Sequence, residues 1–221
     1  MFKVKRMDFL VSLYIFGILV AELLGAKTFP LLKIGTYTLN ASVAFFIIPL
    51  LFTINDVIVE VHGAARARSV VRSGLIMIIL LFFYIMFAMY LPPSKRFAES
   101  EAAYDSVFGK SARIAFASLT AFALADFLDI YLFSQIREKM GKSKLWLRNN
   151  LSNIISSLID TVVFMTLAFY ALDKTPADNW TFLISLIIPY WLLKCSMSVI
   201  ETPFVYLGVR WLKEESKENK K

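Results

Sequence analysis

The stretch SGLIMIILLFFYIMFAMYLPPS, Ser73 to Ser94, contains no charged residue in 22 consecutive positions. A helix needs about 20 mainly apolar residues to cross the roughly 30 Å hydrocarbon core of a bilayer. A second charge-free stretch, Thr36 to Asn55, is long enough for the same purpose. These two stretches predict an integral membrane protein that crosses the bilayer as helices.

The rest of the chain is also strongly apolar. Hydrophobic residues make up 58% of its 221 residues, against about 45–50% in soluble domains. Six apolar segments are predicted to span the membrane: Phe9–Thr28, Thr36–Val61, Val70–Leu91, Ala112–Ile136, Asn149–Leu172 and Asn179–Val209. Pro189 and Pro203 predict a kink or a break in the last segment. The predicted fold is an all-α integral membrane protein, with residues 1–209 as one six-helix transmembrane domain and residues 210–221 as a charged cytoplasmic tail.

The distribution of Lys and Arg predicts the orientation of this domain. Alternate connecting segments and the two termini hold sixteen of the 24 basic residues on one side and seven on the other, with Lys194 inside a segment. Cytoplasmic loops of membrane proteins are enriched in Lys and Arg. We therefore expect both termini in the cytoplasm, the Pro92–Ser111 loop outside, and the cell membrane as the location.

Several classes of function are excluded by residues that the chain lacks. Cys195 is the only cysteine and His62 the only histidine, so no disulfide, zinc cluster or Cys–His pair can form. We expect no metal and no other cofactor. The net charge of +7 comes from basic residues scattered between apolar runs, which favours membrane orientation over nucleic-acid binding.

Polar residues inside the apolar segments are the candidate functional residues. A charged residue at the centre of a membrane helix costs about 2.5–3.5 kcal/mol when it faces lipid. Such groups are therefore expected to face one another or a water-filled cavity that binds a small polar solute. The candidates for substrate binding are Asn55, Asp56, Asp126, Asp129, Asn153, Asp160 and Lys194. A buried salt-bridge cluster that only locks helices together is the alternative.

Helical spacing groups several of these residues. Asn149, Asn153, Ser156 or Ser157, and Asp160 recur every three to four positions and form a polar stripe, as do Lys194, Ser198 and Glu201. Asp126 and Asp129 share a face. Above the cytoplasmic end the segments hold five carboxylates (Glu22, Asp126, Asp129, Asp160 and Glu201) against Lys194 alone, so Asp126 and Asp129 are the candidates for proton-linked groups. Glu22 is expected to line the outer mouth or to extend toward Lys27 at the surface. Asp56 and Glu60 also have a second interpretation, an interfacial ion pair with Arg66 or Arg68.

Two stripes of small residues allow helices to pack closely. They are Gly17, Ala21 and Gly25 in the first segment and Ala117, Ala121 and Ala125 in the fourth. Packing within one chain is the simpler interpretation. Docking on another subunit, as in a homodimer, is the alternative.

Four motifs, taken together, resemble the queuosine precursor transporter family. They are INDVIVEVHG at Ile54–Gly63, DFLDIYLFSQIR at Asp126–Arg137, LWLRNNLSNIISSLIDTVVF at Leu145–Phe164, and Lys194 with Thr202–Pro203. The resemblance implies six membrane helices and uptake of a 7-deazaguanine, such as 7-cyano-7-deazaguanine, by a transporter and not an enzyme. The residues it carries over are Asp56, Glu60, Asp129, Arg148, Asp160 and Lys194. The chain departs from the family at Glu22, Asn55, His62 and Asp126, where Asn, Thr, Tyr and Gln are usual.

The candidate residues themselves agree with this substrate class. A guanine-like edge offers two adjacent N–H donors, which suit a carboxylate, and a carbonyl, which suits Lys or Asn. The main alternative is a substrate-binding subunit of an energy-coupling-factor importer for a vitamin-like solute. A CDP-alcohol phosphotransferase is disfavoured because Asp126 and Asp129 lack the Gly and Ala-Arg that its motif requires, and a purely structural protein is disfavoured by the cost of the charges.

Overall fold

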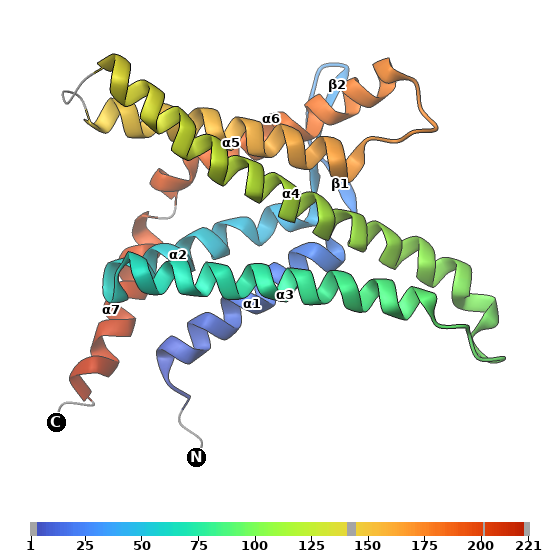
Figure 1. Ribbon diagram of the computed structural model, residues 1–221, viewed down its shortest axis with the longest axis horizontal. Helices are drawn as coiled ribbons and strands as arrows, with labels where there is room; N and C mark the ends of the chain where they lie inside the picture. Colours follow the sequence, from blue (N-terminus) through green and yellow to red (C-terminus); the bar gives the residue numbers. More distant parts are fainter. Residues whose placement is uncertain (1–3, 141–144, 201, 219–221) are drawn as a thin grey trace. The chain divides into compact units, whose positions relative to one another are not determined.

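The computed structural model describes residues 4–140, 145–200 and 202–218, and the side chains of residues 4–125, 154–196 and 203–214. Helices account for most of these residues (Figure 1). In chain order the elements are α1 (Arg6–Leu24), β1 (Thr28–Ile34), β2 (Tyr37–Ser42), the 3₁₀ helix η1 (Val43–Phe46), α2 (Ile48–His62), α3 (Ala64–Tyr90), the 3₁₀ helix η2 (Ala98–Ser100), α4 (Glu101–Met140), α5 (Leu145–Phe169), α6 (Pro176–Ile200) and α7 (Thr202–Glu218). The predicted all-α class is confirmed, with one small hairpin added to it.

The hairpin corrects the prediction that Thr36 to Val61 forms a single helix. Strands β1 and β2 pair through a short turn, and α2 begins only at Ile48. Gly35 in the turn has a φ of 61°, in the left-handed region that glycine adopts without strain. Pro49 lies in the first turn of α2, where its missing N–H has no helical partner to lose. The prediction failed because an apolar run without charges is compatible with a strand as well as a helix.

Four helices of the described part are long and apolar enough to cross a membrane. They are Arg6–Leu24, Val43–His62, Ala64–Tyr90 and Ala98–Ala125, and Ile154–Phe169 is a shorter apolar helix. Each of these four helices overlaps one of the first four predicted segments. The fourth begins at Ala98, so the prediction that Pro92–Ser111 is a loop is wrong for its second half, which is helical. The count of six spans stays a prediction, since the search covers only the described residues.

The last predicted segment consists of two helices. Helix α6 ends at Ile200 and α7 begins at Thr202, with Pro203 in its first turn, so the predicted break is confirmed. Pro189 lies inside α6. Helix α7 then continues through the start of the predicted tail as far as Glu218.

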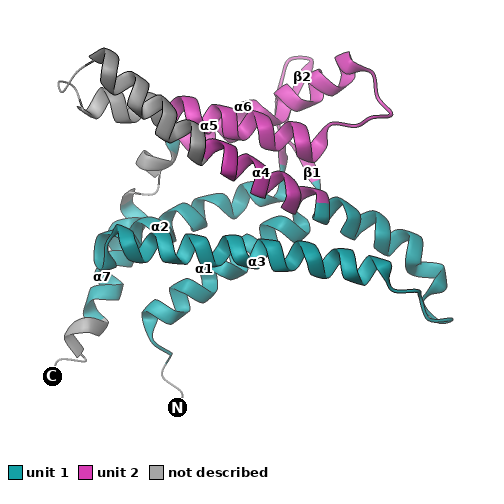
Figure 2. Ribbon diagram, viewed as in Figure 1, with its two compact units in different colours: residues 1–27, 42–112, 196–221 teal, residues 28–41, 113–195 magenta. Residues whose placement is uncertain are grey.

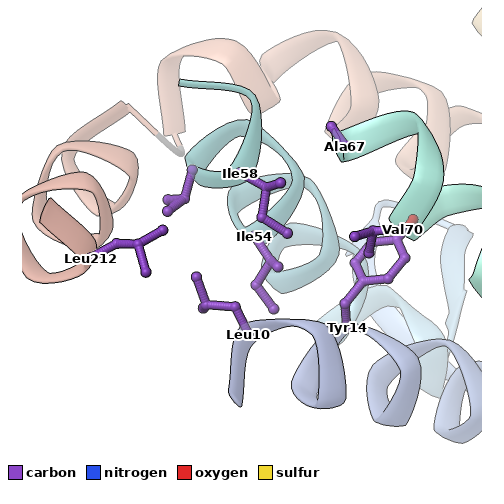
Figure 3. Close-up of a cluster of buried hydrophobic side chains, with 8 residues drawn as sticks. Leu10, Tyr14, Ile54, Ile58, Ala67, Val70 and Leu212 are labelled. Atoms are coloured by element: carbon purple, nitrogen blue, oxygen red, sulfur yellow. The ribbon is translucent and has the colours of Figure 1, made fainter. Parts of the chain in front are cut away.

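The chain divides into two compact units, each described by itself (Figure 2). Unit 1 contains residues 1–27, 42–112 and 196–221. Its core is a cluster of buried side chains from α1, α2, α3 and α7, shown in Figure 3: Leu10, Tyr14, Ile54, Val57, Ile58, Ala67, Val70 and Leu212. Gly208 lets α7 approach α2 closely, because a Cβ there would lie 2.6 Å from Val57 Cγ2. Asp56 and Glu60 therefore lie on a helix whose opposite face is well packed.

Contacts between α1 and α7 place the two ends of the chain at one level of unit 1. The Arg6 guanidinium lies 5.2 Å from the centroid of the Trp211 ring and donates a hydrogen bond to the Trp211 carbonyl. It also lies 3.7 Å from a carboxylate oxygen of Glu214, and the Phe9 ring meets the Trp211 ring edge to face at 6.3 Å. Because these residues are in direct contact, Arg6 and Trp211 lie on the same side of any membrane that the helices cross.

Unit 2 contains residues 28–41 and 113–195, including α5 and most of α6. Arg113 on α4 donates hydrogen bonds to the carbonyls of Leu167 and Tyr170, at 2.7 and 2.6 Å, and so caps the C-terminal end of α5. The buried Asn179 amide bonds both the N–H and the carbonyl of Ala171, at 2.8 and 2.7 Å. The connection between α5 and α6 is therefore held at both of its ends.

Candidate functional site

The structure brings two of the predicted site residues together. Lys194 Nζ on α6 donates a hydrogen bond to Asp160 Oδ2 on α5 at 2.5 Å. The two residues are 34 positions apart in the chain, and both lie well inside otherwise apolar helices. A contact this short between opposite charges removes most of the cost of placing either one in a membrane.

Thr161 extends this pair into a small polar network. Lys194 Nζ also donates to Thr161 Oγ1 at 3.1 Å, and the Thr161 hydroxyl donates to the Ser157 carbonyl at 2.7 Å. Thr161 is buried, with 1% of its surface exposed, whereas 25% of the Asp160 side chain and 19% of the Lys194 side chain are exposed. The ion pair is therefore supported from the buried side and remains accessible from the other.

The pair has unused hydrogen-bonding capacity. A lysine ammonium has three donors, of which Asp160 and Thr161 take two. Within the described residues, Asp160 Oδ1 has no hydrogen-bond partner, since the carboxylate meets Lys194 through Oδ2. A polar solute with both donors and an acceptor can use these free positions.

Other residues of the predicted α5 stripe are only partly described. Ser156 is buried at 8% exposure, and the Ser157 hydroxyl donates to the Ile154 carbonyl at 3.1 Å. The side chains of Asp126, Asp129, Asn149, Asn153, Ser198 and Glu201, together with Arg148, lie outside the described residues. Their place in the site therefore stays a prediction, although α4 and α5 do carry the backbones of the first four as helix.

The acidic residues of α2 have different surroundings. Asp56 and Glu60 are exposed, on the face of the helix opposite Ile54, Val57 and Ile58. Asn55 is partly buried beside them. Among the described side chains, Asp56 and Glu60 form no ion pair with Arg66, Arg68 or any other residue. The interpretation as an interfacial ion pair therefore stays a prediction. Gly63 ends α2 with a φ of 82°, as its position predicts.

Glu22 is a further carboxylate within a predicted span. It lies on α1 and is buried, with 5% of its surface exposed. A side chain with so little exposure does not extend to the surface beside Lys27, so that alternative is wrong. Its placement at the outer mouth of a cavity stays a prediction.

The small-residue stripe of α1 is occupied by side chains of the same chain. A Cβ added at Gly17 would lie 2.9 Å from Leu51 Cδ2 and 3.3 Å from Ile47 Cγ2, so Gly17 allows close packing within unit 1. Ala117 and Ala121 in the second stripe are buried, at 0% and 1% exposure. Packing within one chain is confirmed at Gly17, and this position offers no free surface for another subunit.

Two contacts of unit 2 were not predicted from the sequence. Asn40 on β2 donates to Ser185 Oγ on α6 at 2.8 Å, and Arg113 caps α5 as described above. Asn40 lies within the predicted segment Thr36–Val61, and Arg113 lies at the start of the predicted segment Ala112–Ile136. Asn40 is a polar residue in an apolar run, and Arg113 is a charged residue at the start of one. Such residues are candidates for a contact, but their partners cannot be identified until the topology is known.

Comparison with known proteins gives consistent matches along the chain. The family described as "Putative vitamin uptake transporter" matches residues 42–208. This range covers α2 to the start of α7 and therefore includes the Asp160–Lys194 pair.

Three curated relatives are named as queuosine precursor transporters. The chain is 32% identical to the "Probable queuosine precursor transporter" of Bacillus subtilis over 170 residues, which cover 76% of this chain and 72% of the relative. It is 28% identical to the "Queuosine precursor transporter" of Escherichia coli over 152 residues, which cover 68% and 64%. A relative from Haemophilus influenzae is 28% identical over 134 residues, covering 60% and 54%. No solved structure matches the chain.

Proposed function

Since the chain belongs to the vitamin uptake transporter family and is similar to queuosine precursor transporters, we propose that it is a multi-pass membrane transporter of a queuosine precursor. The substrate class we propose is a 7-deazaguanine, such as 7-cyano-7-deazaguanine. The observation that supports it most directly is the ion pair between Asp160 and Lys194, which joins the apolar helices α5 and α6 and keeps one side accessible.

The ion pair suits recognition better than simple locking of two helices. A lock is most stable when both charges are buried and every donor and acceptor has a partner. Here about a quarter of the Asp160 side chain is exposed, and its second oxygen is unbonded within the described residues. A pair with free acceptor and donor positions can exchange its internal bond for bonds to a solute.

The chemistry of the substrate edge matches this exchange. A guanine-like edge presents a ring N–H and an exocyclic amino group side by side, next to a carbonyl. In our proposal both oxygens of Asp160 accept the two N–H donors, while the Lys194 ammonium moves to the carbonyl and keeps its bond to Thr161. Each charge then has hydrogen-bond partners on the substrate, and these bonds offset the cost of weakening the direct contact between the two charges in an apolar region.

The remaining predicted residues complete the proposal. Asn55, Asp56, Asp126, Asp129 and Asn153 are proposed to bind the rest of the substrate, and Asp126 and Asp129 to exchange the proton. Both termini are proposed to face the cytoplasm. Two observations support this orientation: Arg6 contacts Trp211 directly, and the basic residues are enriched on the side of the termini.

Binding to purified protein tests the substrate class. We expect 7-cyano-7-deazaguanine and its aminomethyl analogue to displace a bound 7-deazaguanine, and adenine not to, because the adenine edge lacks the paired donors and the carbonyl. Equal competition by adenine would contradict recognition of the edge by a carboxylate. The chain supplies a matched control pair: Asp173 and Lys174 are 3.7 Å apart and exposed, so neutralising them should leave binding unchanged.

A further inference from the structure

The hairpin β1–β2 is closed at its base by hydrogen bonds within unit 1. The Ser42 hydroxyl donates to the Gly25 carbonyl at 2.6 Å, and the Val43 N–H donates to the Lys27 carbonyl at 2.9 Å. Ser42 Oγ also accepts from the Ala44 N–H at 3.2 Å and so caps the 3₁₀ helix η1. Both ends of the hairpin are therefore fixed where they leave α1 and enter η1.

The body of the hairpin is held against α6 in unit 2. Asn40 Nδ2 donates to Ser185 Oγ at 2.8 Å, and the Tyr37 hydroxyl donates to the Thr181 carbonyl at 3.2 Å. Thr181 and Ser185 are four residues apart and lie on one stripe of α6. Ser185 is 2% exposed and Ala41, next to Asn40, is fully buried. Strand β2 thus packs along the N-terminal half of α6, while most of β1 is exposed.

Pro189 makes the next turn of α6 a weak point. Proline has no N–H, so the carbonyl four residues earlier, that of Ser185, loses its helical hydrogen bond, and the helix bends more easily there. The Ser185 side chain carries the contact with Asn40, and Lys194 lies five residues beyond the proline. The hairpin therefore holds α6 immediately before its weak turn, and the functional lysine lies immediately after it.

We propose that the hairpin is a fixed clamp on α6 and that Asn40 is a positioning residue for Lys194. The clamp holds the N-terminal half of α6, so that any bending is confined to the half beyond Pro189, and Lys194 keeps the register in which it reaches Asp160 and Thr161. The hairpin stays docked throughout transport. The role assigned to Lys194 rests on the proposed function, but the clamp itself does not.

Hydrogen exchange gives a direct readout of this clamp. The backbone amides of α6 beyond Pro189 are protected by the helix and become accessible when the helix opens. In Asn40→Ala we expect deuterium labelling of these amides about fivefold faster than in the wild type, as expected for the loss of one hydrogen bond that restrains the helix. Ser185→Ala should give the same increase, and the double variant no further increase. Lys33→Ala, on the exposed strand β1, is the control that should label at the wild-type rate.

An unchanged labelling rate in both Asn40→Ala and Ser185→Ala would overturn the proposal. The labelling needs no substrate, so its result is independent of which solute the protein transports. The apparent affinity for a 7-deazaguanine then tests the link to Lys194: it should weaken by a similar factor in both variants. Faster labelling without binding of any 7-deazaguanine by the wild type would leave the clamp supported and count against the proposed function alone.

A disulfide tests whether the hairpin stays docked. In a Cys195→Ser background, Asn40→Cys and Ser185→Cys place two thiols where a hydrogen bond of 2.8 Å joins the native side chains. We expect the oxidised protein to take up substrate at the rate of its reduced form. Inhibition that a reducing agent reverses would show that the hairpin must leave α6 during transport, and this result would overturn the clamp.

Discussion

Two helices of this protein carry carboxylates in apolar surroundings and treat them differently. On α5, Asp160 meets Lys194 of α6 at 2.5 Å, and Thr161 supports the pair from the buried side. On α2, Asp56 and Glu60 are exposed on the face opposite the core, and within the described part of the chain neither has an ionic partner. The same sequence signal therefore corresponds to a charge paired within the chain in one region and, in the other, to exposed charges without an ionic partner among the described residues.

The difference shows what can and cannot be predicted from the free-energy cost of placing a charge in a membrane. Because of this cost, a carboxylate within a span must be compensated by a partner, water or a proton. It does not say which of these applies, because the partner comes from another helix. We expect the compensated region to respond to substitution with loss of both stability and binding, and the α2 face to respond with loss of binding alone.

The largest effect is expected for Asp160→Asn. The substitution removes a charge-assisted contact to the substrate and leaves Lys194 without its counter-charge in an apolar seam. We expect binding to fall about a hundredfold. The free energy of unfolding should fall by about 2 kcal/mol, less than for a fully buried pair because both side chains are partly exposed. Titration with ligand and thermal unfolding in detergent measure the two effects.

A double variant separates the two losses. Asp160→Asn combined with Lys194→Met removes both charges, so the stability should return toward that of the wild type, whereas binding should remain lost. Recovery of binding in the double variant would contradict a role of the pair in recognition and would favour a pair that only locks the helices.

The next largest effect is expected for Arg113→Met, at the C-terminal end of α5. Arg113→Met removes two hydrogen bonds, to the carbonyls of Leu167 and Tyr170, and so uncaps α5. Because Arg113 is exposed to solvent, we expect a loss of about 1 kcal/mol in the free energy of unfolding, with little change in ligand affinity. Arg210→Met is the matched control: Arg210 is 82% exposed and pairs with Glu214 at 3.4 Å, a surface contact that contributes almost nothing. Equal effects of the two variants would contradict the capping role.

A smaller effect on stability is expected for Asp56→Asn on α2. The exposed side chain has no partner among the described residues, so the free energy of unfolding should change by less than about 0.5 kcal/mol. Binding should weaken about tenfold if the carboxylate contacts substrate, as the family resemblance implies. Thermal unfolding compared side by side with Asp160→Asn measures the contrast. A loss of stability as large as that of Asp160→Asn would show that α2 and α5 do not differ as proposed.

The sequence predicted most of the helices for physical reasons that act locally, and it predicted that charged groups such as Asp160 and Lys194 face one another or a cavity. The charge-free run Ser73–Ser94 is long enough to cross a bilayer as a helix and forms most of α3, and a lysine among membrane carboxylates needs a counter-charge. The hairpin at residues 28–42 could not be predicted in this way, because its apolar residues satisfy strand and helix equally and only Gly35 signals a turn. The contacts of Arg113 and Asn40 depend on which elements pack together. The spacing of residues along a single helix gives no information on that packing, so these contacts could not be predicted.

The smallest effect is expected for Asp129→Asn, which tests the proton. Asp126 and Asp129 lie three residues apart on α4 and therefore on one face of the helix. Like charges this close disfavour each other's ionised form, whereas Asp160 contacts the ammonium of Lys194; we therefore propose that the exchangeable proton lies on the α4 pair. If the proton enters with the substrate, an inward pH gradient should accelerate uptake into vesicles by about two- to threefold. Asp129→Asn should then bind substrate normally but lose this acceleration, since an amide carries no exchangeable charge. Uptake by the wild type at the same rate with and without the gradient, at matched internal pH, would make the transport facilitated diffusion and the proton of the α4 pair structural.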